Sequence, residues 1–215
     1  MTRPSRTTNP EGRWPVLVAF LAVAGIALSL PHSLVFGPRW LLPAVVTGLL
    51  VVATLAHRTS NHRLDRILGF VISGVVTLGL VGSLALLITT LPTKSETPAS
   101  LLGSAASLWV CNVIVFAIWY WRLDAGGPHA REVRGEHTAG AFFFPQMMDG
   151  APVENPKGWT PRFIDYLFLA FNTSTAFSPT DTAVLSRWAK GLSMLQALIS
   201  LLIVAILASR AVGLL

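Results

Sequence analysis

Charged residues are scarce in this chain of 215 residues, at 12% of the sequence, where soluble domains carry roughly a quarter. This scarcity excludes a disordered chain, a nucleic-acid-binding domain and a typical soluble enzyme. Cysteine is almost absent too, with Cys111 as its single example. A lone cysteine excludes an intrachain disulfide and a cysteine metal cluster, and we interpret Cys111, inside an apolar block, as a small buried hydrophobic residue.

Sequence motifs of enzymes are also missing. Neither a P-loop, nor an HExxH pair, nor a GxSxG nucleophile turn occurs in the chain. We therefore expect no enzymatic activity, no cofactor and no metal. His129 and His137 lie in a polar segment without metal-ligand spacing, and this favours two surface histidines.

Long apolar runs dominate what is present, with 53% hydrophobic residues and a mean hydropathy of +0.61. An apolar helix of about 20 residues crosses the hydrocarbon core of a bilayer, which is roughly 30 Å thick. Such blocks occupy residues 14–36, 41–56, 67–91, 101–123 and 192–215, separated by polar segments at 57–66, 92–100 and 124–160. The pattern predicts an all-α, polytopic membrane protein with five transmembrane helices.

The basic residues indicate an orientation, so we interpret the net charge of +6 as membrane topology. With five spans and a cytoplasmic N-terminus, 13 of the 16 Lys and Arg residues lie inside, and Arg39, Lys94 and Arg210 lie outside. An excess of basic residues on the cytoplasmic side is typical of membrane proteins. The count therefore predicts a cytoplasmic N-terminus.

The segment 161–182 predicts a re-entrant loop. Pro161 suits the first turn of a helix, and the apolar run 163–171 that follows is too short to span a membrane. A polar run, 172–175, and the turn-like residues 176–181 precede the last long helix. Non-helical backbone is tolerated at membrane depth only where protein or a water-filled cavity surrounds it.

This segment resembles the pore module of potassium channels. Phe171 and Thr173 match the end of the pore helix, Thr175 matches the Thr before the filter, and Asp181 matches the filter Asp. Residues 196–200 resemble the stretch that ends in the hinge glycine of the inner helix, here Ser200. The resemblance implies an outer helix (101–123), an extramembrane loop (124–160), a re-entrant pore helix and filter-like turn (161–182) and an inner helix (183–215) within a module 101–215. A basic tail (1–13) and three transmembrane helices (14–100) precede this module, and a homotetramer is expected.

The filter sequence itself departs from that family. Ala176, Phe177, Ser178, Pro179 and Thr180 stand where potassium channels have T-V-G-Y-G. The filter glycines permit left-handed backbone angles, which a β-branched Thr resists, and Pro179 fixes its own φ and restricts Ser178. We therefore expect no stack of potassium sites. Hydroxyl groups and a ring of Phe177 side chains set the constriction, or the pore is closed.

About half of the chain also resembles an uncharacterised family of bacterial integral membrane proteins. The matching residues include 119–121, 126–128, 144–146, 165–167 and 176–181. This resemblance supplies no activity. It implies a bacterial inner-membrane location and an altered filter that belongs to a whole family.

Each candidate site residue has two interpretations. The filter-like residues Thr173, Thr175, Ala176, Phe177, Ser178, Pro179, Thr180 and Asp181 line a conduit, or their hydroxyls bond to nearby backbone while the turn packs as an ordinary loop. Asp181 attracts cations or caps the last helix.

The last helix carries three polar residues on one face, namely Ser193, Gln196 and Ser200. They either line the pore or join helices by hydrogen bonds. Asn112 is interpreted as a link between helices, and Asp165 as a partner of Arg162.

The sequence thus favours a tetrameric, potassium-channel-like ion channel with a non-standard filter, which passes a monovalent cation or another small solute. Its expected partners are other copies of the chain, the lipid bilayer and monovalent cations. With a cytoplasmic N-terminus the re-entrant loop enters from the cytoplasm, inverted relative to potassium channels. One alternative is a non-conducting structural or regulatory membrane protein. Another is a small-solute transporter, for which the chain lacks room for inverted repeats.

Overall fold

The computed structural model describes residues 12–58, 62–90, 97–134, 137, 140–148 and 159–212. Most of the basic tail 1–13, the loop residues 91–96 and residues 149–158 of the segment 124–160 lie outside the described residues. Within the described part the chain is all-α, with two strands of two residues each as its β-structure. The predicted all-α class is therefore confirmed.

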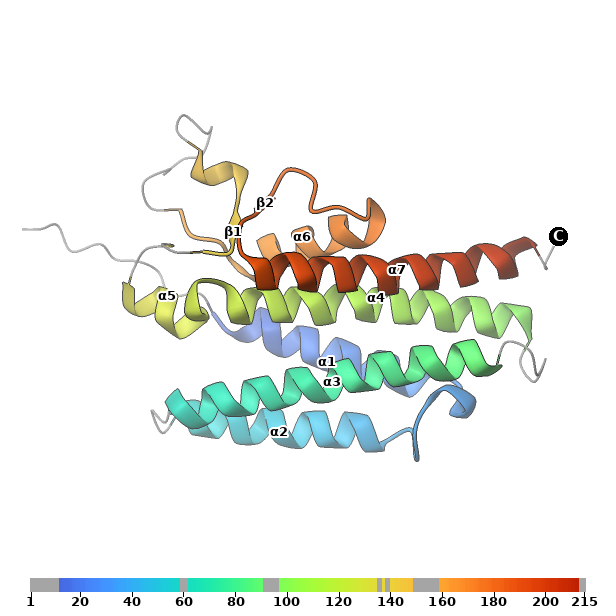
Figure 1. Cartoon of the computed structure of the whole chain (residues 1–215). Helices are drawn as coiled ribbons and strands as arrows, with labels where there is room; N and C mark the ends of the chain where they lie inside the picture. The colour runs from blue at the N-terminus through green and yellow to red at the C-terminus, as the bar shows by residue number, and fades with distance from the viewer. Residues whose placement is uncertain are drawn as a thin grey trace, which may run out of the picture.

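Five long helices lie side by side and alternate in direction, with most of the shorter elements at one end and η1 at the other (Figure 1). In chain order the elements are α1 (Trp14–Ser29), η1 (His32–Leu34), α2 (Leu41–Arg58), α3 (His62–Thr90), α4 (Pro98–Leu123), η3 (Asp124–Gly126), α5 (Pro128–Arg134), β1 (Phe142–Phe143), η4 (Pro145–Met147), α6 (Phe163–Thr175), β2 (Ala183–Val184) and α7 (Arg187–Val212). Helices α1, α3 and α7 begin at the same end of the bundle, where α2 and α4 finish. We call this the basic end, because Arg13, Arg66 and Arg122 lie there.

Three of these helices are long and apolar enough to cross a membrane, namely Arg63–Thr89, Ala99–Gly126 and Arg187–Ser209. This finding supports a membrane protein in the general sense. The apolar helices Trp14–Ser29 and Leu41–Ala56 are shorter than the length that a straight span needs. Their place in a five-span arrangement is part of the proposal below.

The first apolar block is not one continuous helix, which corrects the predicted span 14–36. Helix α1 ends at Ser29, and Leu30 is extended at φ −70° and ψ 145°. Pro31 explains this end, because a proline lacks an amide hydrogen and pushes the preceding residue out of the helical region. The chain then forms the short turn η1, in which Leu34 is fully buried.

The other helix boundaries follow local sequence signals. Thr97 caps α4 by accepting a hydrogen bond of 3.2 Å from the Ser100 amide, and Pro98 occupies the first turn. After Leu123, positive φ angles at Gly126 and Gly127 turn the chain. At Gly127 a Cβ would lie 2.8 Å from the carbonyl oxygen of Arg122, so the turn requires glycine.

The last helix begins later than the predicted boundary at residue 183. Ala183 and Val184 form β2, which pairs antiparallel with β1 and holds the chain at the basic end. Helix α7 starts at Arg187, and Ser186 accepts a hydrogen bond of 3.3 Å from the Ala189 amide. The cap is therefore Ser186, and the interpretation of Asp181 as the N-cap of this helix is wrong.

Helix α6 packs against both α4 and α7, while α1 and α3 cover other faces of α4. Figure 1 shows α6 alongside α7, from the basic end to about the middle of that helix. The buried core runs continuously through these contacts and includes Phe20, Ile72, Phe116, Tyr120, Leu169 and Ile203. The C-terminal helices thus form one packed unit that positions the candidate site.

Candidate functional site

The candidate site is the C-terminal end of α6, the turn that follows it and the face of α7 against which both lie. At the start of α6, the Asp165 carboxylate accepts a hydrogen bond of 2.7 Å from the backbone amide of Arg162. This contact satisfies one of the free donors at the helix start. The predicted pairing of Asp165 with Arg162 therefore involves the backbone amide of Arg162.

Helix α6 has two different faces. Tyr166, Leu169 and Ala170 are fully buried against α4 and α7, whereas Ile164, Phe168 and Phe171 are exposed. The exposed residues recur at helical spacing and form one apolar stripe. This stripe is exposed in the single chain.

Gln196 of α7 holds the last turns of α6 in place. Its side chain is fully buried, and Nε2 donates to the Ala170 carbonyl oxygen at 2.7 Å and to Ser174 Oγ at 2.8 Å. The hydroxyl of Tyr120, on α4, donates to Gln196 Oε1 at 2.5 Å. One side chain therefore links three helices, and all of its polar groups are paired, as burial requires.

Ser200 makes a second link further along α7. Its hydroxyl donates to the Ser174 carbonyl oxygen at 2.6 Å and accepts a bond of 3.0 Å from Trp109 Nε1 of α4. Asn112, also on α4, donates from Nδ2 to Ser174 Oγ at 3.3 Å and to the Gln196 carbonyl oxygen at 3.4 Å. The interpretation of Asn112 as a link between helices is confirmed.

The three predicted pore-lining residues are thus brought together, but inside the chain. Gln196 and Ser200 are fully buried, and Ser193 is 7% exposed with its Oγ 3.3 Å from the Tyr120 hydroxyl. Their contacts support the interpretation that these residues join helices by hydrogen bonds. The exposed side chains of α7 are mostly apolar and include Met194, Leu195, Leu198, Leu201 and Leu202.

The filter-like hydroxyls of α6 bond to their own helix. The hydroxyl of Thr173 donates to the Leu169 carbonyl oxygen at 2.8 Å and is buried, while that of Thr175 donates to the Phe171 carbonyl oxygen at 2.9 Å and is exposed. Both are contacts of residue i with residue i−4, the pattern common for Ser and Thr in helices. Of these two hydroxyls, that of Thr175 is on the surface next to the turn.

The turn itself contains two strained residues. Phe177 and Thr180 have φ angles of +54° and +56°, in the left-handed region that favours glycine. The expectation that a β-branched Thr180 avoids this region is wrong. The Thr180 hydroxyl donates to the Pro179 carbonyl oxygen at 2.9 Å and lies 3.0 Å from Asp181 Oδ1, and these local bonds help to hold its backbone.

The filter-like turn presents its polar groups to the outside of the single chain. Ser178, Thr180 and Asp181 are exposed, and Phe177 is 44% exposed. The Thr180 amide donates to Ser178 Oγ at 3.3 Å, so the turn is partly closed on itself. Its outward groups can still contact an ion, water or another copy of the chain.

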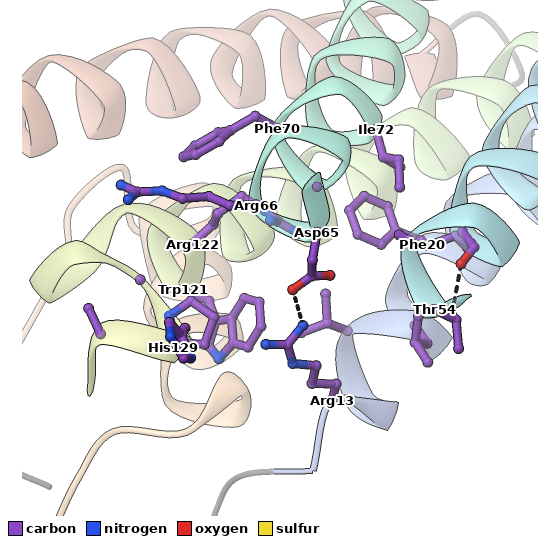
Figure 2. Close-up of a pocket in the computed structure, with 18 of the residues that line it drawn as sticks. Arg13, Phe20, Thr54, Asp65, Arg66, Phe70, Ile72, Trp121, Arg122 and His129 are labelled. Carbon is purple, nitrogen blue, oxygen red and sulfur yellow. Dashed lines mark hydrogen bonds and ion pairs between the residues drawn. The ribbon is translucent and has the colours of Figure 1, made fainter. Parts of the chain in front are cut away.

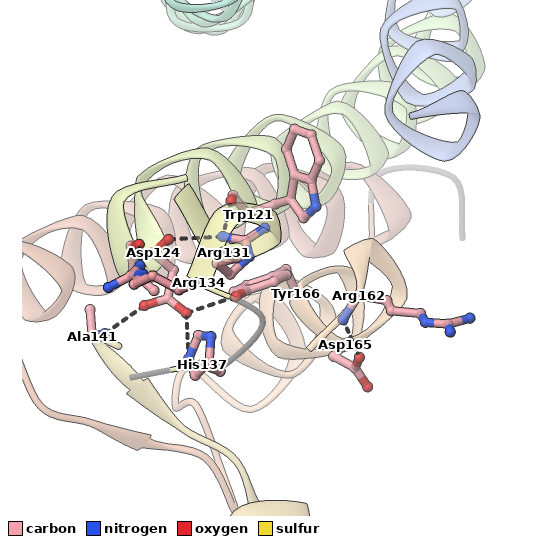
Figure 3. A network of polar contacts seen from close by, with 10 residues as sticks. Trp121, Asp124, Arg131, Arg134, His137, Ala141, Arg162, Asp165 and Tyr166 are labelled. Carbon is pink, nitrogen blue, oxygen red and sulfur yellow. Dashed lines mark hydrogen bonds and ion pairs between the residues drawn. The ribbon is translucent and has the colours of Figure 1, made fainter. Parts of the chain in front are cut away.

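A buried polar cluster beneath the site anchors α6 at the basic end (Figure 3). Asp124, at the end of α4, is fully buried and accepts hydrogen bonds from the Tyr166 hydroxyl at 2.7 Å and the Ala141 amide at 2.5 Å. His137 Nε2 lies 3.1 Å from Asp124 Oδ2, the oxygen that also accepts the bond from Tyr166. The carboxylate therefore joins α4, α6 and the segment that leads into β1.

Arg131 of α5 completes this cluster. Its Nη1 donates to the carbonyl oxygens of Trp121 and Asp124, both at 2.8 Å, and the guanidinium carbon lies 5.4 Å from the ring centroid of Tyr166. The side chain is 7% exposed. A cation this deeply buried is stabilised by carbonyl oxygens and ring faces, and it fixes the end of α4 relative to α6.

The sequence interpretation missed this cluster. His137 was expected at the surface, but its side chain is 3% exposed beside Asp124, which corrects that expectation. Asp124, Arg131 and His137 lie within one short stretch of the sequence, but Tyr166 is 42 residues from Asp124, and none belongs to a motif with fixed spacing. An Asp directly after an apolar helix was the available signal, because a carboxylate there needs a partner or water.

Comparisons of this chain with protein-family models, with curated proteins and with solved structures find no match. The resemblances to the potassium-channel pore module and to the bacterial membrane-protein family therefore stay predictions. The function has to be argued from the helices and the turn themselves.

Proposed function

We propose that α4, α6 and α7 form the pore module of a membrane channel, which passes a monovalent cation or another small solute through an assembly of identical chains, with a tetramer as the expected number. The observation that carries this proposal is the position of the turn 176–181. It is polar, non-helical and exposed, and it lies beside the middle of an apolar helix long enough to cross a membrane.

The depth of the turn follows from helix lengths and one hydrogen bond. Helix α6 has 13 residues, and at 1.5 Å per residue it reaches about 20 Å from the basic end. Its last turn bonds to Ser200, which lies near the middle of the 26 residues of α7. If α7 spans the bilayer, the turn lies within the hydrocarbon region.

Polar backbone at that depth needs protein or water around it. Lipid offers no hydrogen-bond partner, and lipid-exposed irregular loops do not occur within the hydrocarbon region. The exposed oxygens of Thr175, Ser178 and Thr180 would lose their hydration if they faced lipid. Assembly of several chains around these oxygens encloses them in a water-filled path, and the apolar stripe of α6 becomes part of the contact between chains.

Conduction would depend on partial dehydration at the turn. Hydroxyl and carbonyl oxygens replace part of the water around a cation, and the Asp181 carboxylate raises the local cation concentration. The negative end of the α6 dipole points toward the same place. Phe177 narrows the path, and the apolar face of α7 gives a vestibule wall that can gate by dewetting.

The charge distribution supports an inverted entry of the loop. Helix α6 begins at the basic end, where the described residues Arg13, Arg63, Arg66, Arg122, Arg131, Arg134, Arg162, Arg187 and Lys190 are located, while Arg39 lies toward the opposite end. The positive-inside rule assigns the basic end to the cytoplasm. In this five-span arrangement the loop enters from the cytoplasmic side.

One observation favours the alternative of a non-conducting structural or regulatory membrane protein. Ser193, Gln196 and Ser200 are buried within the single chain, so they stabilise helix packing. An assembly with an apolar inner wall and a closed turn would keep the architecture of a channel without conducting. Flux measurements separate the two functions.

The deciding experiment measures monovalent cation flux in liposomes that contain the purified full-length protein. Wild-type protein is expected to pass K⁺ or Na⁺, and Phe177→Ala is expected to raise the rate by widening the constriction. Phe36→Ala is the matched control, because Phe36 is also exposed but lies in the turn after η1, away from the site. Conduction would be refuted if no flux of any small ion were measured for the wild type, for Phe177→Ala and for Pro179→Gly.

A further inference from the structure

A cavity of about 190 Å³ lies at the basic end, and none of the turn residues 176–181 lines it. Residues from α1, α2, α3, the end of α4 and the turn into α5 line it. Figure 2 shows Arg13 and Asp65 facing each other across the cavity, with Trp121 and His129 on one side and Phe20 and Thr54 on the other. The cavity therefore combines a charged region with an apolar wall.

Positive charge is in excess among the residues that line the cavity. Arg13, Arg66 and Arg122 contribute three guanidinium groups, whereas Asp65 is the single carboxylate among the described lining residues. Asp65 forms an ion pair with Arg13. Three guanidinium groups and one carboxylate leave a net positive charge among the described residues that line this cavity.

Of these cations, Arg122 gives the main evidence for a ligand in this cavity. Its Nε is buried and finds no hydrogen-bond acceptor among the described residues. The guanidinium instead lies against ring faces, with its carbon 5.7 Å from the centroid of Phe70 and 6.0 Å from that of Trp121. Buried polar groups normally have a partner, so the unpaired Nε of Arg122 is a free donor for an acceptor from outside the chain.

The adjacent helix makes room for that arginine. Gly69 of α3 faces Arg122, and a Cβ at this position would overlap the guanidinium group. Arginine presents a planar set of donors that matches the oxygens of a phosphate group. The other side of the cavity is apolar, with Phe20, Leu50 and Ile72 as lining residues, and it suits a hydrocarbon chain.

We propose that this cavity binds a phosphate group, and that its source is the headgroup of an anionic phospholipid, with the phosphate at Arg122 and Arg66 and the start of an acyl chain along the apolar wall. Basic cavities between membrane helices on the cytoplasmic side are suited to such headgroups. The proposal depends on membrane insertion of the chain. Its binding tests need no ion flux, so they can fail or succeed independently of the channel proposal.

Native mass spectrometry of the full-length protein tests the proposal, with phosphatidylglycerol and phosphatidylcholine of identical acyl chains added in equal amounts. We expect preferential binding of phosphatidylglycerol and a loss of roughly tenfold or more in its affinity for Arg122→Gln. Arg66→Gln is the second variant, and because Arg66 is exposed, we expect this variant to fold as the wild type does. Arg63→Gln is the matched control, because Arg63 is exposed on the same helix but does not line the cavity.

Equal binding of the two lipids by wild-type protein would overturn the proposal, as would an equal loss for Arg63→Gln and both cavity variants, which would indicate a general surface-charge effect. Thermal unfolding with inorganic phosphate distinguishes the two sources of the phosphate group. Stabilisation by phosphatidylglycerol, but not by inorganic phosphate at the same concentration, supports the lipid. Equal stabilisation by inorganic phosphate would overturn the assignment to a lipid.

Discussion

The hydroxyl of Ser200, near the middle of α7, donates a hydrogen bond of 2.6 Å to the backbone carbonyl oxygen of Ser174 in the last turn of α6. This bond sets how far α6 extends along α7 and therefore where the filter-like turn lies. Both residues are fully buried, so water does not compete for the bond. The position of the turn is thus built into the fold of the single chain.

The link made by Gln196 should be important for stability. Gln196→Leu removes one hydrogen-bond partner each from the Ala170 carbonyl, Ser174 Oγ and the Tyr120 hydroxyl, and we expect the free energy of unfolding to fall by about 1–3 kcal/mol. Denaturant unfolding in detergent micelles measures this. Met194→Leu, at an exposed position on the same helix, is the control and should change it by less than about 0.5 kcal/mol. Equal stability of the two variants would contradict a structural role for Gln196.

The buried carboxylate at the end of α4 should matter more than the exposed one in the turn. Asp124→Asn places an amide nitrogen among groups that donate to the carboxylate, and a loss of about 2–4 kcal/mol in unfolding free energy is expected. Asp181→Asn should leave stability unchanged, because Asp181 is exposed. Thermal unfolding of both variants checks the contrast, and a double-mutant cycle of Asp124→Asn with Tyr166→Phe should show coupling.

The two positions that lost the filter glycines should respond in opposite ways. Thr180 has a positive φ, so Thr180→Gly removes backbone strain and should raise the unfolding free energy by about 1 kcal/mol. Ser178 is not among the described residues with positive φ, and Ser178→Gly should leave stability unchanged or lower it by up to about 1 kcal/mol. Calorimetry of the two variants measures the difference. A gain from Ser178→Gly and none from Thr180→Gly would show that the turn has another backbone conformation.

Two glycines of α3 provide a matched pair for the cavity at the basic end. In Gly69→Ala the new methyl group displaces the Arg122 side chain, whose flexible end can move at little cost in stability. We expect a several-fold loss of preference for anionic phospholipid with a stability change below about 1 kcal/mol. At Gly74 a Cβ meets nothing within 4 Å, so Gly74→Ala should keep the lipid preference of the wild type. Lipid competition measured by native mass spectrometry compares the two variants.

The charge of Asp181 leads to a prediction about conduction. If the turn lines a cation path, Asp181→Asn should lower cation flux several-fold at low ionic strength and much less at high ionic strength, where salt screens the carboxylate. Flux in liposomes at two salt concentrations measures this effect. A loss that does not depend on salt would mean that Asp181 acts through the shape of the turn.

The helical architecture could be predicted from the sequence because long apolar blocks and glycine–proline breaks are local signals. The ends of the helices could be predicted less well. Pro31 ends α1 inside an apolar run, and Ser186, not Asp181, caps α7 because β2 intervenes. The first error came from treating apolar length as helix length, and the second from ignoring a strand of two residues.

The contacts of the candidate site were harder to predict than its location. The sequence indicated where the turn lies and that Ser193, Gln196 and Ser200 share one helix face, but not which neighbour that face meets. Pairing of Asp124 with Tyr166 depends on how the chain returns to the basic end after β1, which no local pattern encodes. Burial of a charged group is a tertiary property, so only the packed structure identifies it.

Cross-linking at the turn tests the central claim, that residues 176–181 meet their counterparts from other copies within the membrane. In a Cys111→Ala background, which removes the single native cysteine, Ser178→Cys is expected to form a disulfide between chains when membranes are treated with an oxidant. Leu78→Cys is the control, because Leu78 is 75% exposed on α3, away from the module. The account predicts a covalent dimer for Ser178→Cys alone, and monomers from both variants would contradict it.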